Sequence, residues 1–129
     1  MQKLANCEFI INIERIEHLF IEGLRLEIVF STTDKKRHKF IFDGVLDIRC
    51  SIENASIDRF CEFRKCLTGG IIDNSVYVVE DSEYIKYFEH QVSGTHSIDE
   101  LNHYIVSDNL DTIVDILVDR KKPTIIPHD

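Results

Sequence analysis

The side chains of this sequence that could bind a metal or carry out catalysis are six histidines, four cysteines and a large set of carboxylates. Spacings such as Cys-x-x-Cys and His-x-x-x-His bring two zinc ligands together, and neither occurs in the sequence. The pattern therefore favours histidines scattered over the surface and free, mostly buried thiols. We expect neither a metal nor a cofactor.

Acid–base or nucleophilic chemistry would need residues that fold together from distant segments. His103 and Asp108 could form an acid/base pair in a pocket between a helix and a sheet, and Cys61 could pair with His90 or His103. A Gly-rich phosphate loop, a Gly-x-Ser-x-Gly elbow, a His-Glu-x-x-His motif and a complete calcium loop are all missing. We therefore expect that the protein is not an enzyme, with an α+β enzyme or ligand-binding domain as the alternative.

Negative charge is concentrated in the C-terminal half of the chain. Residues 1–68 contain eleven Lys or Arg and eleven Asp or Glu, whereas residues 69–129 contain four and twelve. Four minus twelve gives −8 for the second segment, which is the whole net charge. Such a charge distribution attracts a cationic partner, raises encounter rates and repels nucleic acid and anionic membranes.

Tyrosines and carboxylates occur together in this acidic half, a combination suited to an interface with a basic partner. The candidates for partner contacts are Asp81, Glu83, Tyr84, Tyr87, Asp108 and Asp111. The alternative interpretation of these residues is solvated charge and the edges of an amphipathic core. The most basic stretch, Lys35–Lys39, lacks interleaved aromatic residues for base stacking, so we expect no nucleic-acid binding.

Alternating apolar residues predict two strands in the first third of the chain, over Cys7–Ile13 and Leu24–Phe30. The segment Arg15–Gly23 between them is interpreted as a short helical turn or loop. Ser31–Arg37 contains no apolar residue and predicts a solvated connection between strands.

An Asp-Gly pair predicts a hairpin in the middle of the chain, with Phe40–Phe42 and Val45–Ile52 as its strands. Asp43-Gly44 supplies the positive φ angles that a tight turn requires. Either a bulge at Gly44 shifts the register, which is favoured, or both faces of the hairpin are partly covered. The residues expected to face the core are Leu46, Ile48, Cys50 and Ile52. The following segment, Glu53–Cys66, is ambiguous between a helix, which is favoured, and a continued strand.

The second half of the chain gives clearer patterns. Val76–Glu80 predicts a strand, and Ser82–Val92 predicts an amphipathic helix that is capped by Asp81 or Ser82 and lies on a sheet.

Leu101–Ser107 and Thr112–Asp119 predict an antiparallel hairpin around a turn at Asp108–Asp111. One face of the second strand, with Val114, Ile116 and Val118, should meet the core. The opposite face carries a mixed apolar and acidic stripe, which is either half covered by another element or presented to a partner. The stripe consists of Ile113, Asp115, Leu117 and Asp119.

These patterns together predict one α+β domain over residues 1–129, mainly an antiparallel sheet with one or two amphipathic helices packed on it. The length suffices for a core without disulfide bridges. No signal peptide and no apolar run long enough for a bilayer occur in the sequence, so we expect a cytoplasmic protein without a membrane partner.

Three stretches of the chain resemble small bacterial immunity proteins. They are Val45–Ala55, Val76–Gly94 and His103–Leu117, about half of the chain. The resemblance is in the general residue pattern, the size and the strand order, and it includes no signature motif.

The resemblance implies an immunity protein of a polymorphic-toxin or contact-dependent growth inhibition system. Such a protein would bind and neutralise a cognate toxin domain, for example a nuclease, in the cytoplasm of the producing cell. The expected interaction is between an acidic surface of this chain and a basic surface of the toxin. The resemblance implies no catalytic residues. A homodimer that pairs through the Ile113–Asp119 stripe is a third option.

Overall fold

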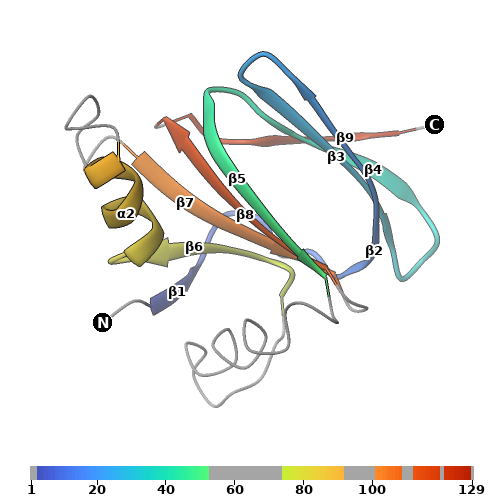
Figure 1. Ribbon diagram of the computed structural model, residues 1–129. Coiled ribbons are helices and arrows are strands. Elements are labelled where there is room, and N and C mark those ends of the chain that lie inside the picture. Colours follow the sequence, from blue (N-terminus) through green and yellow to red (C-terminus); the bar gives the residue numbers. More distant parts are fainter. Residues whose placement is uncertain (1–2, 53–73, 92–100, 109–111, 120, 129) are drawn as a thin grey trace.

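The computed structural model describes residues 3–52, 74–91, 101–108, 112–119 and 121–128 (Figure 1). Within these ranges the chain forms nine β-strands and one α-helix. In chain order these are β1 (Lys3–Asn6), β2 (Ile13–Glu22), β3 (Arg25–Thr32), β4 (Arg37–Phe42), β5 (Val45–Ile52), β6 (Val76–Glu80), α2 (Glu83–Gln91), β7 (Leu101–Ser107), β8 (Thr112–Asp119) and β9 (Thr124–Pro127). The predicted helix at Glu53–Cys66 lies outside the described residues.

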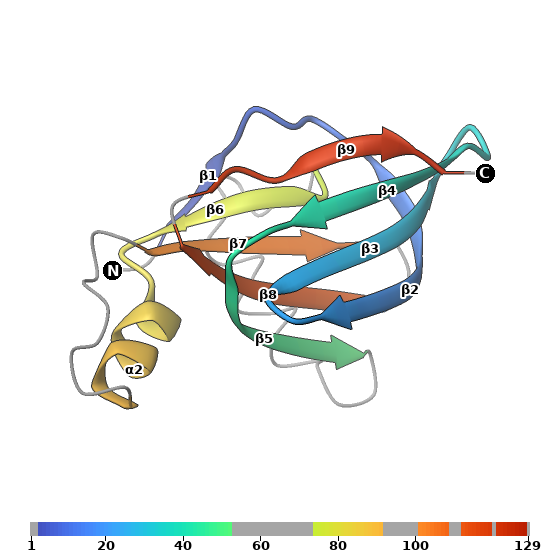
Figure 2. The same cartoon turned by 90° about the horizontal axis from the view of Figure 1, so that it is seen from above.

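The strands form two antiparallel sheets that pack face to face (Figures 1 and 2). The five-stranded sheet has the order β1-β6-β7-β8-β5, and the four-stranded sheet has the order β2-β3-β4-β9. The β7–β8 hairpin supplies two adjacent inner strands of the first sheet, and the β2–β3–β4 meander forms most of the second.

The main hydrophobic core lies between the two sheets. Phe30, Phe40 and Phe42 enter it from the four-stranded sheet, and Tyr104 and Ile116 enter it from the five-stranded sheet. The rings of Phe42 and Tyr104 meet edge to face across the interface, with their centroids 5.6 Å apart. Complete burial of side chains of this size stabilises the fold by about 1.5–3 kcal/mol each. The core therefore accounts for the pairing of the two sheets.

The outer face of the five-stranded sheet is also covered. Ile113 and Leu117 of β8 are fully buried on it. Leu117 packs with Tyr84 and Ile85 of α2, so the helix covers this end of the sheet. Two alternatives were predicted for the stripe on β8. For its apolar residues, Ile113 and Leu117, coverage by another part of the chain is confirmed, and exposure to a partner is wrong.

The predicted α+β fold class is wrong, because the described residues form a mostly β structure with a single short helix. Part of the reason is Arg15–Gly23, which we expected to be a helical turn or loop and which lies largely within β2. The side chains of Ile13, Ile16 and Leu19 all pack on the core between the sheets. Two register shifts, between Ile13 and Arg15 and between Ile16 and His18, interrupt the pairing of β2 with β3. These bulges replace the alternation of a regular strand with a spacing of three, which imitates a helix.

The predicted hairpin around Asp43-Gly44 is also wrong. β4 pairs with β3 and β9, whereas β5 pairs with β8 in the other sheet. Gly44 does have the expected positive φ, 72°, but it turns the chain from one sheet to the other. A bulge in that hairpin therefore does not occur, and the irregularity between Val45 and Asp47 belongs to the pairing of β5 with β8. Cys50, which was expected to face the core, is exposed.

The predictions for the second half of the chain are largely confirmed. The bounds of β6, β7 and β8 agree with the sequence pattern, and β7 and β8 form the expected antiparallel hairpin. Val114, Ile116 and Val118 face the core between the sheets as predicted. The described residues contain no helix with the length and hydrophobicity that a membrane span requires.

Candidate interaction surface

The helix α2 begins directly after β6 because two consecutive residues reverse the chain. Asp81 has a φ of 54°, a left-handed conformation in which Asp is among the favoured non-glycine residues. Ser82 then caps the helix, since its Oγ accepts a hydrogen bond from the backbone N–H of Ile85 at 3.1 Å. Glu83 follows in the first turn, where its negative charge interacts favourably with the positive end of the helix dipole.

Three exposed carboxylates and one exposed tyrosine lie at the start of α2 and form an acidic helix surface, which we define as Glu80 at the end of β6, Asp81 in the following turn, and Glu83 and Tyr87 of α2. All four residues are exposed, and Tyr87 retains 65% of its accessible area. Residues 80–91 contain four acids and one base, Lys86, so their net charge is one minus four, or −3. An exposed aromatic ring among carboxylates is suited to contact with a cationic surface.

Lys86 organises two of these carboxylates. Its Nζ lies 2.7 Å from Asp81 Oδ1 and 4.0 Å from Glu83 Oε1. The Lys86 ammonium is the main reason why the pKa of Asp81 is lowered to about 2. Asp81 therefore stays charged at any physiological pH.

Three of the six predicted contact residues, Asp81, Glu83 and Tyr87, lie on the acidic helix surface. Two others, Tyr84 and Asp108, are buried. Asp111 lies outside the described residues. The structure therefore brings together the exposed residues around α2, and it places Asp108 in a buried position elsewhere.

Tyr84 attaches the helix to β5. Its hydroxyl donates a hydrogen bond to Asp47 Oδ2 at 2.6 Å, and the guanidinium carbon of Arg49 lies 4.0 Å from the centre of its ring. Burial is the first cause, and the Asp47 carboxylate the second, of a strongly raised pKa of the Tyr84 hydroxyl. The side chain thus anchors α2 and is unavailable as an exposed contact.

Asp108 connects the β7–β8 turn to the four-stranded sheet. One carboxylate oxygen accepts a hydrogen bond from the backbone N–H of Thr112 at 2.9 Å, and the other accepts one from the N–H of Ile16 at 3.0 Å. Ile16 borders one of the bulges in β2, where the strand pairing is interrupted. The carboxylate supplies a partner for a backbone group at that position, which is a structural role.

A buried polar network that the sequence analysis did not predict lies beneath α2. His103 Nδ1 is 2.6 Å from Ser82 Oγ, and His103 Nε2 is 2.7 Å from Asp115 Oδ1. His103 was expected to pair with Asp108, and its actual carboxylate partner is Asp115. Because the Asp115 carboxylate accepts, Nε2 donates to it, and Nδ1 forms the second hydrogen bond of the ring with the Ser82 hydroxyl.

A serine, a histidine and a carboxylate in this order can activate a serine nucleophile, but this arrangement lacks what that reaction needs. All three side chains are buried, with His103 only 1% exposed. Ser82 Oγ also accepts the N–H that starts the helix. The network therefore fixes the position of α2 on the sheet, and the exposed acidic residues are attached to a rigid support.

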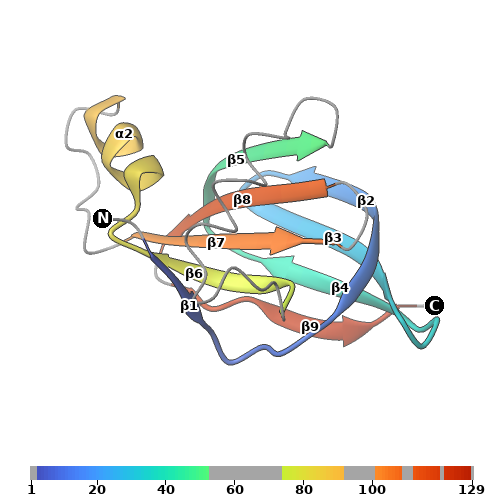
Figure 3. The ribbon, with the colours of Figure 1, turned by 90° about the horizontal axis from the view of Figure 1, so that it is seen from below.

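The basic residues of the β3–β4 turn lie far from this surface. Figures 2 and 3 place α2 and the β3–β4 turn at opposite ends of the molecule. Near the turn, Arg37 contacts Glu17 Oε1 through two nitrogens at 3.0 Å, and Lys39 contacts Glu27 at 2.9 Å. These cations pair within their own sheet, so they do not neutralise the acidic helix surface.

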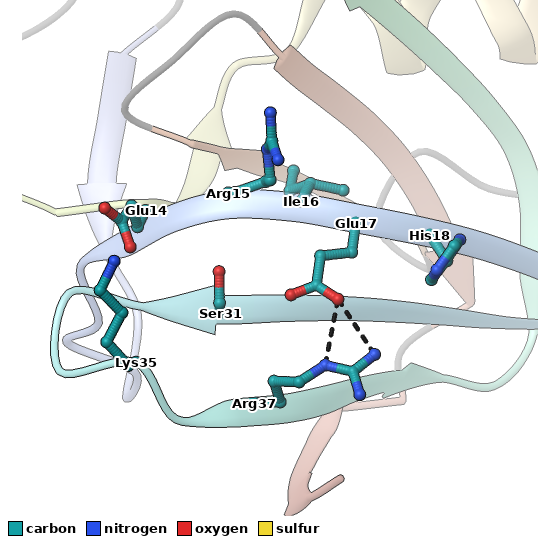
Figure 4. Close-up of a pocket in the computed structure, with 8 residues that line it drawn as sticks. All are labelled: Glu14, Arg15, Ile16, Glu17, His18, Ser31, Lys35 and Arg37. Carbon is teal, nitrogen blue, oxygen red and sulfur yellow. Dashed lines mark hydrogen bonds and ion pairs between the residues drawn. The ribbon is translucent and has the colours of Figure 1, made fainter. Parts of the chain in front are cut away.

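The Arg37–Glu17 pair lies in a hollow of about 660 Å³ on the four-stranded sheet (Figure 4). Its lining contains both signs of charge, and its residues are Glu14, Arg15, Ile16, Glu17, His18, Ser31, Lys35 and Arg37. Three bases against two acids leave a net charge of only +1. This hollow therefore selects neither sign of ligand strongly.

Comparisons of the chain with protein-family models, with curated proteins and with solved structures found no match. Within the ranges that the structure describes, no three His, Cys, Asp or Glu side chains are grouped closely enough to hold a metal ion. The function is therefore inferred from the geometry and charge of the acidic helix surface.

Proposed function

We propose that the protein is an immunity protein that binds and neutralises a cognate bacterial toxin domain, such as a nuclease, through the acidic helix surface. The observation that carries the proposal is the group of three exposed carboxylates, Glu80, Asp81 and Glu83, at the start of α2 beside the exposed ring of Tyr87. The partner would present a basic surface, and the complex would form in the cytoplasm of the producing cell.

Electrostatics explains how such a surface would act. A nuclease needs a cationic groove for its substrate, and an acidic surface can bind in that groove or bind beside it and block access to it. Complementary fields accelerate association to about 10⁸ M⁻¹s⁻¹ or more at low salt, which suits an inhibitor that must capture every toxin molecule. Tyr87 would supply a desolvated contact in the centre of the interface.

The support beneath the helix adds to the proposal. A surface that is already in its binding conformation loses less entropy when it binds. Here the contact of Ser82 with His103 and the bond of Tyr84 to Asp47 hold both the start and the first turn of α2 on the sheet. The carboxylates and Tyr87 therefore project from a fixed helix.

The alternative, an enzyme or a ligand-binding domain with His103 in a pocket between helix and sheet, has less support. His103 is buried, and its two ring nitrogens contact Ser82 and Asp115. A general acid or base must reach its substrate directly or through one water. The closed packing around His103 does not provide that access.

Co-expression tests the proposal. A toxin domain encoded beside this chain would be expressed in bacteria with the wild-type protein, with a variant carrying Glu83→Lys and Tyr87→Ala, or with Glu22→Lys. Glu22 is exposed in the β2–β3 hairpin and gives a matched charge reversal outside the acidic helix surface. Growth is expected with the wild type and the control and not with the double variant. Growth arrest with all three, despite equal protein levels, would contradict the proposal.

A further inference from the structure

The segment between β1 and β2 closes one side of the space between the sheets. Asn74 Oδ1 accepts the N–H of Ile11 at 2.9 Å, and Asn74 Nδ2 donates to the carbonyl of Phe9 at 3.0 Å. Ser75 binds the backbone of the next residues: its N–H donates to the carbonyl of Ile11, and its Oγ accepts the N–H of Ile13. Ile11 of this segment and Ile125 of β9 line the same hollow.

These bonds fix the direction of the side chains between them. Phe9 and Ile11 pack on the core between the sheets, and Ile10 points away with 83% of its area exposed. A single exposed isoleucine is ordinary, and the position of Ile10 beside a hollow is what makes it relevant here. Ile10 forms one rim of a hollow of about 430 Å³.

The hollow opens between the two sheets and has an apolar floor. Phe30, Ile11 and Ile125 line it, and the ring of His38 stacks on Phe30 with centroids 5.6 Å apart and planes 26° apart. Its volume falls within the range of small-ligand sites, which favour concave apolar surfaces with a few polar groups. Phe30 is only 1% exposed, so the half-buried ring of His38 is the part of the pair that a planar ring can contact.

One ionised group gives the hollow its charge preference. Asp34 lines it together with the hydroxyls of Thr32 and Thr33. The Thr32 hydroxyl donates to Asp34 Oδ1 and is the largest cause of a lowered pKa of that carboxyl, so Asp34 is an anion at neutral pH. Lys35, the next residue in sequence, lines the separate hollow around Glu17 and Arg37. Lys36 donates its backbone N–H to Asp34 Oδ1, and its charge also contributes to the lowered pKa of Asp34.

We infer that this hollow, at the mouth between the sheets, binds a small aromatic amine. The ring lies between Ile10 and the Phe30–His38 pair, and the ammonium group faces Asp34. This site is separate from the acidic helix surface and does not depend on the binding of a toxin.

Backbone amide NMR with three probes tests the inference. Phenethylamine has the ring and the charge, phenylacetate has the ring with the opposite charge, and butylamine has the charge without the ring. Phenethylamine is expected to bind with a Kd of about 1 mM, a value typical of a ligand this small, and to shift the signals of residues 10–12 and 32–34. The other two probes are expected to bind much more weakly.

Two variants and one control locate the site. Asp34→Asn is expected to weaken phenethylamine binding by about fivefold, because a charge-assisted contact becomes a neutral one. Ile10→Lys should weaken it as well, whereas Leu24→Lys, at a residue 63% exposed in the β2–β3 hairpin, should not. Equal affinity for phenethylamine and phenylacetate, shifts outside the hollow, or no change in Ile10→Lys would each overturn the inference.

Discussion

Ser82 of the α2 cap and His103 of β7 lie 2.6 Å apart, and this contact joins the start of the helix to the five-stranded sheet. The same Ser82 oxygen accepts the N–H of Ile85. One hydroxyl group therefore serves both the helix cap and the buried network that ends at Asp115.

Ser82→Ala should destabilise the protein by about 2 kcal/mol, because the helix loses its cap and a buried imidazole nitrogen loses its partner. Denaturant unfolding measures the change. Ser31→Ala, at a half-buried position in β3, is the control and should change the free energy of unfolding by less than about 0.5 kcal/mol. Equal changes in the free energy of unfolding for the two substitutions would show that the hydrogen bonds of Ser82 do not stabilise the fold.

Asp115→Asn should be more damaging than Asp47→Asn. Asp115 is fully buried between His103 and Arg49, and breaking one partner of a buried pair costs about 3–5 kcal/mol. Asp47 is exposed, and an asparagine oxygen can still accept the Tyr84 hydroxyl, so its replacement should cost less than about 1 kcal/mol. The two unfolding curves test the ranking, and a larger loss for Asp47→Asn would contradict it.

The carboxyl of Asp81 should titrate near pH 2 in an NMR experiment. A pKa lowered in the folded state means that the Asp81–Lys86 pair stabilises the protein above the ordinary value of 3.8, and that this contribution is lost as the pH falls through 2. Lys86→Met removes the main cause and should return the pKa toward 3.8. An unchanged pKa in this variant would show that Lys86 is not the cause.

Alkaline pH should destabilise the fold through two buried tyrosines. Burial raises the pKa of Tyr104 to about 12, and burial together with Asp47 raises that of Tyr84. Raised pKa values of acids mean that the stabilisation is complete below the ordinary value of 10 and is lost as the pH rises through the folded value. Tyrosinate absorbance and unfolding should therefore change together above pH 10, and less steeply in Tyr84→Phe. Early tyrosinate formation by both residues without unfolding would contradict their burial.

How far the sequence predicted the fold depended on the regularity of each strand. The β7–β8 hairpin was predicted with its bounds because each strand is a run rich in β-branched and other apolar residues, bounded by polar turn residues and free of bulges. β2 was missed because two bulges change its apolar spacing from two to three. Asp43-Gly44 supplied the expected turn geometry, but no local signal shows whether such a turn joins strands of one sheet or of two.

The candidate site was predicted in part for a similar reason. Exposed acids and Tyr87 on α2 follow from helical spacing, whereas the burial of Tyr84 depends on how the helix packs. The contact of His103 with Asp115 was missed because it depends on the hairpin register. Ser107 pairs with Ile113, which places odd-numbered residues of both strands on one face, whereas the predicted four-residue turn sets Ser107 opposite Thr112. The contribution of Ser82 requires in addition the position of α2 on that face.

The most direct test of the proposed function is a calorimetric titration with the toxin domain encoded beside this chain, at low and at high salt. The double variant Asp81→Lys, Glu83→Lys is expected to bind at least about tenfold more weakly than wild type and with a flatter salt dependence, because rim charges set steering and screening. Glu22→Lys should keep both the affinity and most of the salt dependence. An unchanged affinity in the double variant would show that the toxin does not bind the acidic helix surface.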